Sequence, residues 1–303
     1  MRIVFMGTPD FAVPSLEKLI QNHQVVGVIT QQDKPRGRGR ELLPTPVKKC
    51  AMEHNIDVYQ PDKVSDEQFV SVLKNLEPDV IIVIAFGQIL SKEVLDIPPK
   101  GCINVHASLL PKYRGAAPIQ WAVINGDKKS GVCTMYMEEG LDTGDIIECL
   151  EVELDAKETG GSLFDKLALK GADLILHTLE SIEAGTATRT PQGDDYTYAS
   201  KITKQLGELD FTKDASELEC LIRGVNPWPV AYTSLDGKRV KIYDADVVDG
   251  EGAPGTIISK KKELIIATGN KALSIKEIQP EGKRRMPIKD FLNGKPINAD
   301  IIG

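Results

Sequence analysis

The segment NVHASLLPKYRGAAP, residues 104–118, places two polar side chains at the end of an apolar strand pattern. Asn104 and His106 stand two positions apart, so in a β-strand they point to the same face. A neutral imidazole can accept or donate a proton near neutral pH, and an amide N–H can stabilise a developing oxyanion. The pair is therefore suited to acyl transfer, although a satisfied core histidine beside a capping asparagine would give the same pattern.

A second stretch, GLDTGDI at residues 140–146, places Asp142 between two glycines. Glycines let the backbone approach a ligand closely, and such a loop can hold a carboxylate near a partner. The same residue types are also common in surface turns. Taken alone, Asp142 is a weak candidate for chemistry.

The two stretches, in this order and at this spacing, resemble the folate-dependent formyltransferases. In that family an Asn, a His two residues later, an SLLP loop and an Asp about 36 residues beyond the His form one site. Here these positions are Asn104, His106, residues 108–111 and Asp142, and none of the catalytic positions departs from the pattern. The likeness covers the whole chain through MGTPDFAVPSL at the start, KPRGRGRELLPTPVK, FGQIL and NPWPVAYT.

The resemblance implies that the chain moves a formyl group from 10-formyltetrahydrofolate to the amine of methionyl initiator tRNA, without a metal. Asn104 and protonated His106 would stabilise the tetrahedral oxyanion, while Asp142 would orient His106 and help to move protons. The pterin of the folate would meet backbone groups. The folate-binding residues implied by the resemblance are Ser108, Leu109, Leu110, Pro111, Phe86, Gln88 and Leu90.

The segment KPRGRGR at residues 34–40 combines three arginines with two glycines. It could be a solvated, flexible basic loop. It follows the second predicted strand, however, at the edge of the sheet where a tRNA end must deliver its amine. Together with the resemblance, this position predicts tRNA contacts by Arg36, Arg38 and Arg40, with Arg38 the principal candidate.

The elements that must position these residues alternate along the first half of the chain. Short β-branched runs are typical of buried parallel strands, and helical patterns separate them. This alternation predicts a doubly wound, Rossmann-like α/β domain with a mostly parallel sheet, which binds ligands at the carboxyl ends of its strands. The strand runs lie at 2–6, 25–30, 80–85 and 101–107, and the helical patterns at 10–20, 45–53 and 66–75.

Beyond the first half, the sequence predicts a linker and a second domain. We expect a catalytic domain over residues 1–189, a linker over 190–208, where no period is sustained, and a C-terminal domain over 209–303. Short strands separated by Gly, Asp and Lys in the last part predict a small antiparallel, OB-like β-barrel. Its Lys/Arg clusters at 238–239, 260–262 and 283–285 are either solvated turns or, as the resemblance favours, contacts to the tRNA backbone.

Composition sets further bounds. The net charge of −7 argues against a protein that coats nucleic acid indiscriminately, but it allows local basic patches. No apolar run approaches the roughly 20 residues of a membrane span, and the N-terminal residues lack a signal-peptide pattern. The five cysteines stand singly. We therefore expect a cytoplasmic monomer with free thiols, no metal site and no membrane partner.

Other hypotheses remain open at this stage. A formyltransferase with the same site could act on a sugar-nucleotide amine, or hydrolyse formylfolate without an acceptor. A non-catalytic RNA-binding adaptor could keep the fold, although it has no physical need for three converging polar groups. Gly7 after the first strand suggests a dinucleotide oxidoreductase, but the G-x-G-x-x-G pattern is absent.

Overall fold

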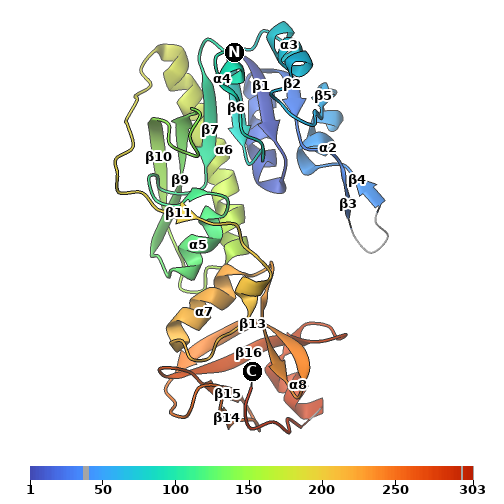
Figure 1. Ribbon diagram of the computed structural model, residues 1–303, viewed down its shortest axis with the longest axis vertical. Helices are drawn as coiled ribbons and strands as arrows, with labels where there is room; N and C mark the ends of the chain where they lie inside the picture. Colours follow the sequence, from blue (N-terminus) through green and yellow to red (C-terminus); the bar gives the residue numbers. More distant parts are fainter. Residues whose placement is uncertain (37–40, 295, 303) are drawn as a thin grey trace. The chain divides into compact units, whose positions relative to one another are not determined.

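The computed structural model describes residues 1–36, 41–294 and 296–302 (Figure 1). The chain divides into two compact units. The first comprises Met1–Gly115, Ser130–Val152 and Phe164–Tyr198, and the second comprises Ala116–Lys129, Glu153–Leu163 and Ala199–Gly303. The two shorter segments, 116–129 and 153–163, thus leave the first unit and return to it.

The first unit is built on a seven-stranded sheet in the order β10-β9-β7-β6-β1-β2-β5. The strands from β5 to β7 pair in parallel, and β9 runs antiparallel to β7. The prediction of an α/β fold with a mostly parallel sheet is therefore confirmed. The strands are β1 (Arg2–Gly7), β2 (Gln24–Ile29), β5 (Val58–Tyr59), β6 (Val80–Ile84), β7 (Cys102–His106), β9 (Lys129–Tyr136) and β10 (Ile146–Glu153).

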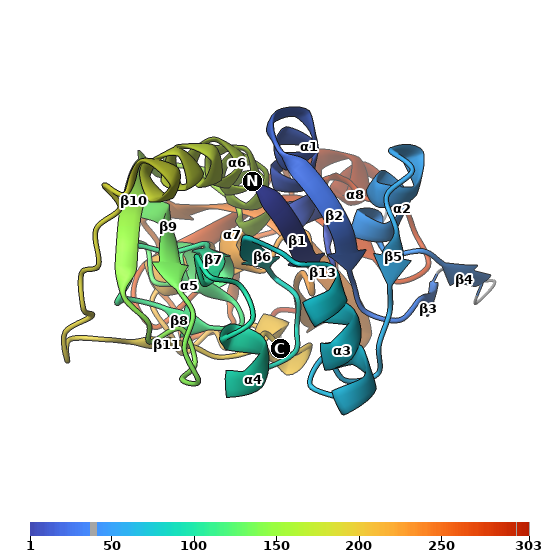
Figure 2. The same cartoon turned by 90° about the horizontal axis from the view of Figure 1, so that it is seen from above.

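Helices cover both faces of this sheet (Figure 2). On one face, α1 lies beside α6: Lys18 forms an ion pair with Asp173, and the rings of Phe11 and Phe164 are 5.2 Å apart. On the other face, α3 and α4 pack on alternate apolar residues of β1 and β6. The helices of this unit are α1 (Val13–Asn22), α2 (Pro46–Glu53), α3 (Glu67–Asn75), α4 (Lys92–Leu95) and most of α6 (Gly160–Ala184), with a 3-10 turn η1 (Asp10–Ala12).

The start of α2 shows how the sequence sets such a helix. Pro46 occupies the first turn, where its missing N–H costs nothing. Thr45 caps the helix, because its hydroxyl accepts a hydrogen bond from the backbone N–H of Lys48 at 3.1 Å. This cap fixes the chain where it returns from the arginine-rich segment.

Alternation along β7 decides which face carries the polar side chains. Val105 faces α6, since its Cγ1 lies 3.1 Å from where a Cβ on Gly171 would stand. Cys102, two positions before Asn104, belongs to the core on the α3 and α4 face. Asn104 and His106 therefore also point away from α6, as the two-residue spacing predicts.

The second unit is an antiparallel sheet with helices. Its strand order is β12-β13-β16-β15-β14, with β17 paired to β16. Gly224 of α7 lets α5 approach, since a Cβ there would lie 2.4 Å from Ile124. The elements are α5 (Pro118–Ile124), η2 (Gln205–Gly207), α7 (Ala215–Gly224), β12 (Ala231–Leu235), β13 (Lys238–Val248), β14 (Ile257–Ser259), β15 (Leu264–Ala267), β16 (Ala272–Pro280), β17 (Met286–Pro287) and α8 (Ile288–Gly294).

The prediction of a separate antiparallel β domain is confirmed, but closure into a barrel is not seen. Within the described residues, β12 and β14 stay at opposite ends of the strand order. Other segments pair with part of both edge strands: Glu208 forms a bridge with Tyr232 of β12, and the backbone N–H of Ile257 of β14 donates to the carbonyl oxygen of Asp300. Local strand patterns predict strands, whereas closure depends on pairing between distant strands that no pattern encodes.

The prediction of free thiols is wrong for two of the five cysteines. Cys133 of β9 and Cys149 of β10 form a disulfide, while Cys50, Cys102 and Cys220 are free. The two cysteines are 16 residues apart, and they meet because β9 and β10 are neighbours in the sheet. Their spacing alone does not reveal that strand register. None of the described helices has the length and apolarity needed to cross a bilayer.

Candidate active site

Three polar side chains converge at the carboxyl end of β7. Asn104 and His106 come from the strand and are buried, and Asp142 comes from the loop between β9 and β10. The amide nitrogen of Asn104 lies 3.5 Å from Asp142 Oδ1, and His106 Nδ1 lies 3.7 Å from Asp142 Oδ2. The structure thus brings together the three residues that the sequence pattern selected.

Backbone groups hold the side chains of His106 and Asp142 in place. His106 Nε2 lies 2.9 Å from the carbonyl oxygen of Tyr113, which can only accept, so Nε2 carries a proton. The other ring nitrogen, Nδ1, faces Asp142. The backbone N–H of Gly115 donates to Asp142 Oδ2 at 2.7 Å. The segment 113–115 therefore holds both members of the His–Asp pair.

The loop that carries Asp142 is closely packed. Asp142 has a φ of 53°, and a Cβ on Gly144 would lie 1.8 Å from the carbonyl oxygen of Tyr136, so only glycine fits there. Gln192 donates to the carbonyl oxygens of Asp142 and Gly144, at 2.9 and 2.8 Å. Sequence reasoning missed Gln192, since it lies in a segment that shows only linker composition.

The SLLP loop lies directly after β7, and most of its side chains anchor it. Ser108 is buried and donates to the carbonyl oxygen of Lys112 at 2.6 Å. Leu110 packs with Cys133, Met135 and Ile146, and Leu109 covers Gly131 of β9. Pro111 is half-buried and follows a cis peptide bond. Folate contact by these four residues stays a prediction, and the apolar packing explains why the loop is held beside the site.

The second predicted folate segment follows β6, the neighbour of β7. Phe86 and Leu90 are buried in the core of the first unit, and Gln88 Oε1 accepts from the backbone N–H of Val64 at 2.8 Å. Ile89, which the sequence pattern did not single out, is 83% exposed. Any ligand at this edge therefore meets Ile89 and backbone groups before it meets Phe86 or Leu90.

The arginine-rich segment begins as a two-stranded hairpin, β3 (Lys34–Arg36) paired with β4 (Glu41–Leu43). Arg38 and Arg40 lie outside the described residues, and so does the side chain of Arg36. The base of the hairpin is described. Asp33 contacts Lys48 Nζ at 2.6 Å and Gln60 Nε2 at 2.8 Å, and these hydrogen bonds lower the pKa of the Asp33 carboxyl.

The basic clusters of the second unit differ in their surroundings. Lys260 pairs with Asp300 at 2.7 Å, and Arg285 pairs with Glu277 and lies over the ring of Tyr243. Among the described residues, the six other cations of these clusters are exposed and have no ion-pair partner, and Arg239 lies over the ring of Tyr232. The six are Lys238, Arg239, Lys261, Lys262, Lys283 and Arg284.

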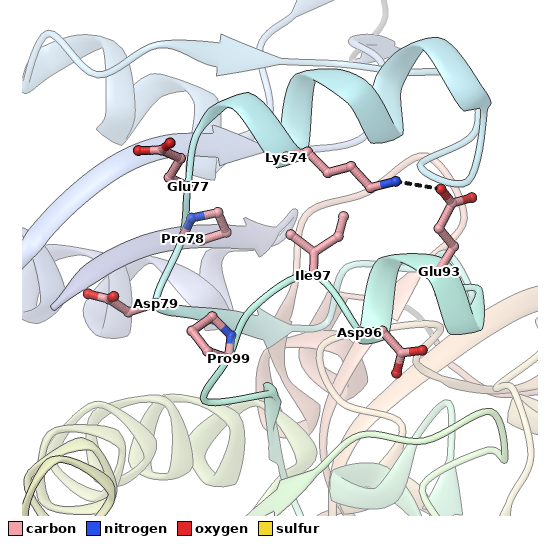
Figure 3. Close-up of a pocket in the computed structure, with 8 residues that line it drawn as sticks. All are labelled: Lys74, Glu77, Pro78, Asp79, Glu93, Asp96, Ile97 and Pro99. Carbon is pink, nitrogen blue, oxygen red and sulfur yellow. Dashed lines mark hydrogen bonds and ion pairs between the residues drawn. The ribbon is translucent and has the colours of Figure 1, made fainter.

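A pocket of about 640 Å³ lies at the opposite edge of the first sheet, next to the amino ends of β6 and β7 (Figure 3). Lys74 and Glu93 form an ion pair of 2.8 Å across it, and Asp79 accepts from the backbone N–H of Arg2. These groups already have partners within the fold. The pocket lies at the other end of β7 from His106, so it is separate from the site. In the described part of the chain, no group of three or more His, Cys, Asp or Glu residues is placed to hold a metal ion.

Comparison with known proteins gives a consistent result. The family model described as formyl transferase matches residues 1–179, and its C-terminal domain model matches residues 201–296. A methionyl-tRNA formyltransferase of Agathobacter rectalis is 55% identical over 299 residues, covering 97% of this chain and 96% of that protein. A methionyl-tRNA formyltransferase of Lachnospira eligens is 53% identical over 312 residues, covering 100% of this chain and 99% of that protein.

A solved structure shares the fold. The N-formyltransferase from Helicobacter canadensis, in complex with folinic acid and dTDP-3-aminofucose, has a TM-score of 0.67 and 20% identity to this chain. The match covers 90% of this chain and 98% of that one.

Proposed function

Because the chain belongs to the formyl transferase family, and within it to the methionyl-tRNA formyltransferases, we propose that it transfers the formyl group of 10-formyltetrahydrofolate to the amino group of methionyl initiator tRNA. The observation that carries this proposal is the convergence of Asn104, His106 and Asp142 at the carboxyl end of β7. Open α/β sheets bind their ligands at that edge.

In the proposed reaction, the free amine of the methionyl group attacks the formyl carbon. A C–N bond forms, and the carbonyl electron pair moves to oxygen, giving a tetrahedral oxyanion. The amide of Asn104 has two N–H donors, one of which faces Asp142 at 3.5 Å, so the other can serve the oxyanion. A protonated His106 adds positive charge in a buried setting, where charge acts more strongly than in water.

The oxyanion then collapses, and the bond from carbon to the folate nitrogen breaks. One proton leaves the attacking amine, and one proton must reach the departing nitrogen. The Asp142 carboxylate can take up one proton while the Nδ1–H of protonated His106 supplies one, so the pair ends with the same number of protons as it began. Gly115 N–H keeps the carboxylate in place throughout.

The folate is proposed to lie between the loop of residues 108–111 and the segment 86–90. The two segments follow neighbouring parallel strands, so they meet at the same edge of the sheet. Exposed Ile89 offers apolar contact, and backbone groups of the two segments supply hydrogen bonds to the pterin.

The acceptor is proposed to contact Arg36, Arg38 and Arg40 of the segment 34–40, and the exposed cations of the second unit. We also propose that residues 209–303 serve as the OB-like tRNA-binding domain predicted from the sequence, joined to the catalytic domain (1–189) by the linker (190–208). The enzyme is proposed to act as a monomer in the cytoplasm.

The proposed function is tested by comparing three formyl acceptors. Labelled 10-formyltetrahydrofolate is offered to the enzyme with methionyl initiator tRNA, free methionine or an amino-sugar nucleotide, and formylated products are counted. Label on methionyl-tRNA in preference to the other two supports the proposal. Preferred labelling of the sugar nucleotide, or release of free formate without an acceptor, would replace it with one of the alternative activities.

A further inference from the structure

Two tyrosines lie exposed beside the candidate active site. Tyr196 is 43% exposed and Tyr198 is 61% exposed, although the burial of an aromatic ring is energetically favourable. Their ring centroids are 5.4 Å apart, with an angle of 72° between the ring planes. We call these two residues the tyrosine patch. A pair of contacting, exposed aromatic rings is a surface suited to binding another ring.

A buried positive charge supports the patch. Arg114 is 5% exposed, and its guanidinium carbon lies 4.5 Å from the ring centroid of Tyr196. Its Nε–H donates to the neutral side-chain oxygen of Gln192 at 2.9 Å. A buried cation held by neutral partners favours a ligand that brings negative charge nearby.

The patch is bound to the same backbone that holds the His–Asp pair. Thr197, between the two tyrosines, accepts hydrogen bonds from the backbone N–H groups of Arg114 at 2.8 Å and Tyr113 at 2.9 Å. Tyr113 in turn supplies the carbonyl that receives His106 Nε2–H, and Gly115 supplies the N–H for Asp142. The tyrosine patch is therefore fixed next to the catalytic cluster.

We propose that the tyrosine patch stacks the base of the 3′-terminal nucleoside of the acceptor tRNA, with Arg114 favouring the phosphate that precedes it. The proposal rests on the proposed function. In an aminoacyl-tRNA the amino acid is esterified to the terminal ribose, so when its amine reaches Asn104 and His106 the terminal base lies close to the site. Exposed aromatic rings bind single-stranded bases by stacking, and nearby arginines add to this binding.

The test compares variants that lack an aromatic ring with variants that keep it. In Tyr196→Ala and Tyr198→Ala, and in the variant with both changes, kcat/KM for methionyl-tRNA should fall about tenfold or more, since stacking of one base supports an effect of that size. The matched variants Tyr196→Phe and Tyr198→Phe keep the rings and should stay near the wild type. Tyr198 is the cleaner position, because its ring does not cover Arg114 in the described contacts.

Two further measurements identify the ligand. The KM for 10-formyltetrahydrofolate should not change in the alanine variants. Formylation of methionine methyl ester, an acceptor without a nucleoside, should proceed at equal rates in the wild type and the variants, whereas methionyl-adenosine ester should show reduced formylation in the variants. A defect confined to the folate KM would assign the patch to folate and overturn the proposal.

The activity of the wild type distinguishes a failure of the proposed function from a failure of the stacking proposal. If it does not formylate methionyl-tRNA, the proposed function fails, and the stacking proposal fails with it. If it does, and the alanine variants match its kcat/KM on methionyl-tRNA, the stacking proposal alone is wrong.

Discussion

At the scale of single residues, Asp142 organises the site because three nitrogen atoms face its two carboxylate oxygens. Asn104 Nδ2 lies nearest Oδ1, while Gly115 N–H and His106 Nδ1 face Oδ2. The charge of Asp142 is thus directed at Nδ1, the imidazole nitrogen that does not contact Tyr113. Its carbonyl is held separately by Gln192, so the side chain and the backbone of the loop are fixed by different groups.

This arrangement predicts the effect of Asp142→Asn. The amide keeps the shape and can still accept from Gly115 N–H, but the negative charge facing His106 is removed. We expect lower turnover and an altered pH–rate profile, with little change in thermal unfolding. A variant with the rate and pH profile of the wild type would show that Asp142 is not the partner of His106.

Asn104→Ala tests the proposed oxyanion donor. Loss of one such donor typically lowers turnover by roughly 10²- to 10³-fold, because the interaction is strongest in the transition state. Binding of a folate analogue should be nearly unchanged, as measured by titration calorimetry. If Asn104→Ala weakened folate binding and left turnover intact, Asn104 would be a binding residue instead.

Residue patterns could reveal some of these groups and not others. Asn104 and His106 share a strand face through their spacing, and Asp142 stands out between glycines. The carbonyl of Tyr113 and the N–H of Gly115 are backbone groups, which nearly every residue carries, so no pattern marks them. Gln192 acts from a segment after α6, and only the folded chain brings it to Asp142.

At the scale of elements, the base of the arginine hairpin is a small polar network. Lys48 Nζ, at the capped start of α2, bonds both Asp33 and Gln60, and Gln60 bonds Asp33 in turn. Because the network precedes β3 and follows β4, it sets how the hairpin leaves the sheet. The hairpin thus has a fixed base, whatever its arginines contact.

The lowered pKa of Asp33 makes this network sensitive to acid. A carboxyl whose folded pKa lies below its ordinary value of 3.8 stabilises the fold above that pH, and the stabilisation disappears as the pH falls through the folded pKa. Asp33→Asn should lower the unfolding free energy at pH 7 and reduce its change between pH 5 and pH 3. Denaturant unfolding at several pH values measures this.

The control for that experiment is Asp57→Asn, at an exposed aspartate whose carboxylate has no partner among the described contacts. It should leave the pH dependence as in the wild type. Equal pH dependence in Asp33→Asn and the wild type would mean that the hairpin base contributes nothing to acid stability.

Local sequence patterns predict the strands correctly where every residue of the strand is apolar and buried. The runs at β1, β2 and β6 are β-branched and apolar, and they form parallel strands as predicted. The disulfide between Cys133 and Cys149 depends on register between neighbouring strands, and the lack of barrel closure in the second sheet depends on pairing between distant strands. Such pairing is decided by tertiary packing, so the sequence pattern could not predict it.

At the scale of the whole molecule, the net charge of −7 requires that tRNA be met by local basic surfaces. Within the second unit, Lys261, Lys262, Lys283 and Arg284 are exposed and without ion-pair partners among the described residues. Replacing all four with alanine should flatten the slope of log affinity against log salt by about 0.9 for each phosphate of duplex tRNA that the variant no longer neutralises.

A matched control uses the cations that are already paired. The variant Lys260→Ala with Arg285→Ala removes charges held by Asp300 and Glu277, so it should change the salt slope less. Folate affinity should be the same in all of these proteins. If the variant with four replacements had the salt slope of the wild type, these clusters would be solvated turns that do not contact the tRNA.

Whether the polar cluster of the first unit carries out formyl transfer to a tRNA can be measured in a single turnover of the full chain. Labelled 10-formyltetrahydrofolate and methionyl initiator tRNA, both at saturating concentration, are mixed with the wild type and with His106→Ala. We predict rapid formylation by the wild type and a rate roughly 10²- to 10³-fold lower in the variant, with the dissociation constants for the folate and the tRNA unchanged. Transfer by His106→Ala at the rate of the wild type would contradict this prediction.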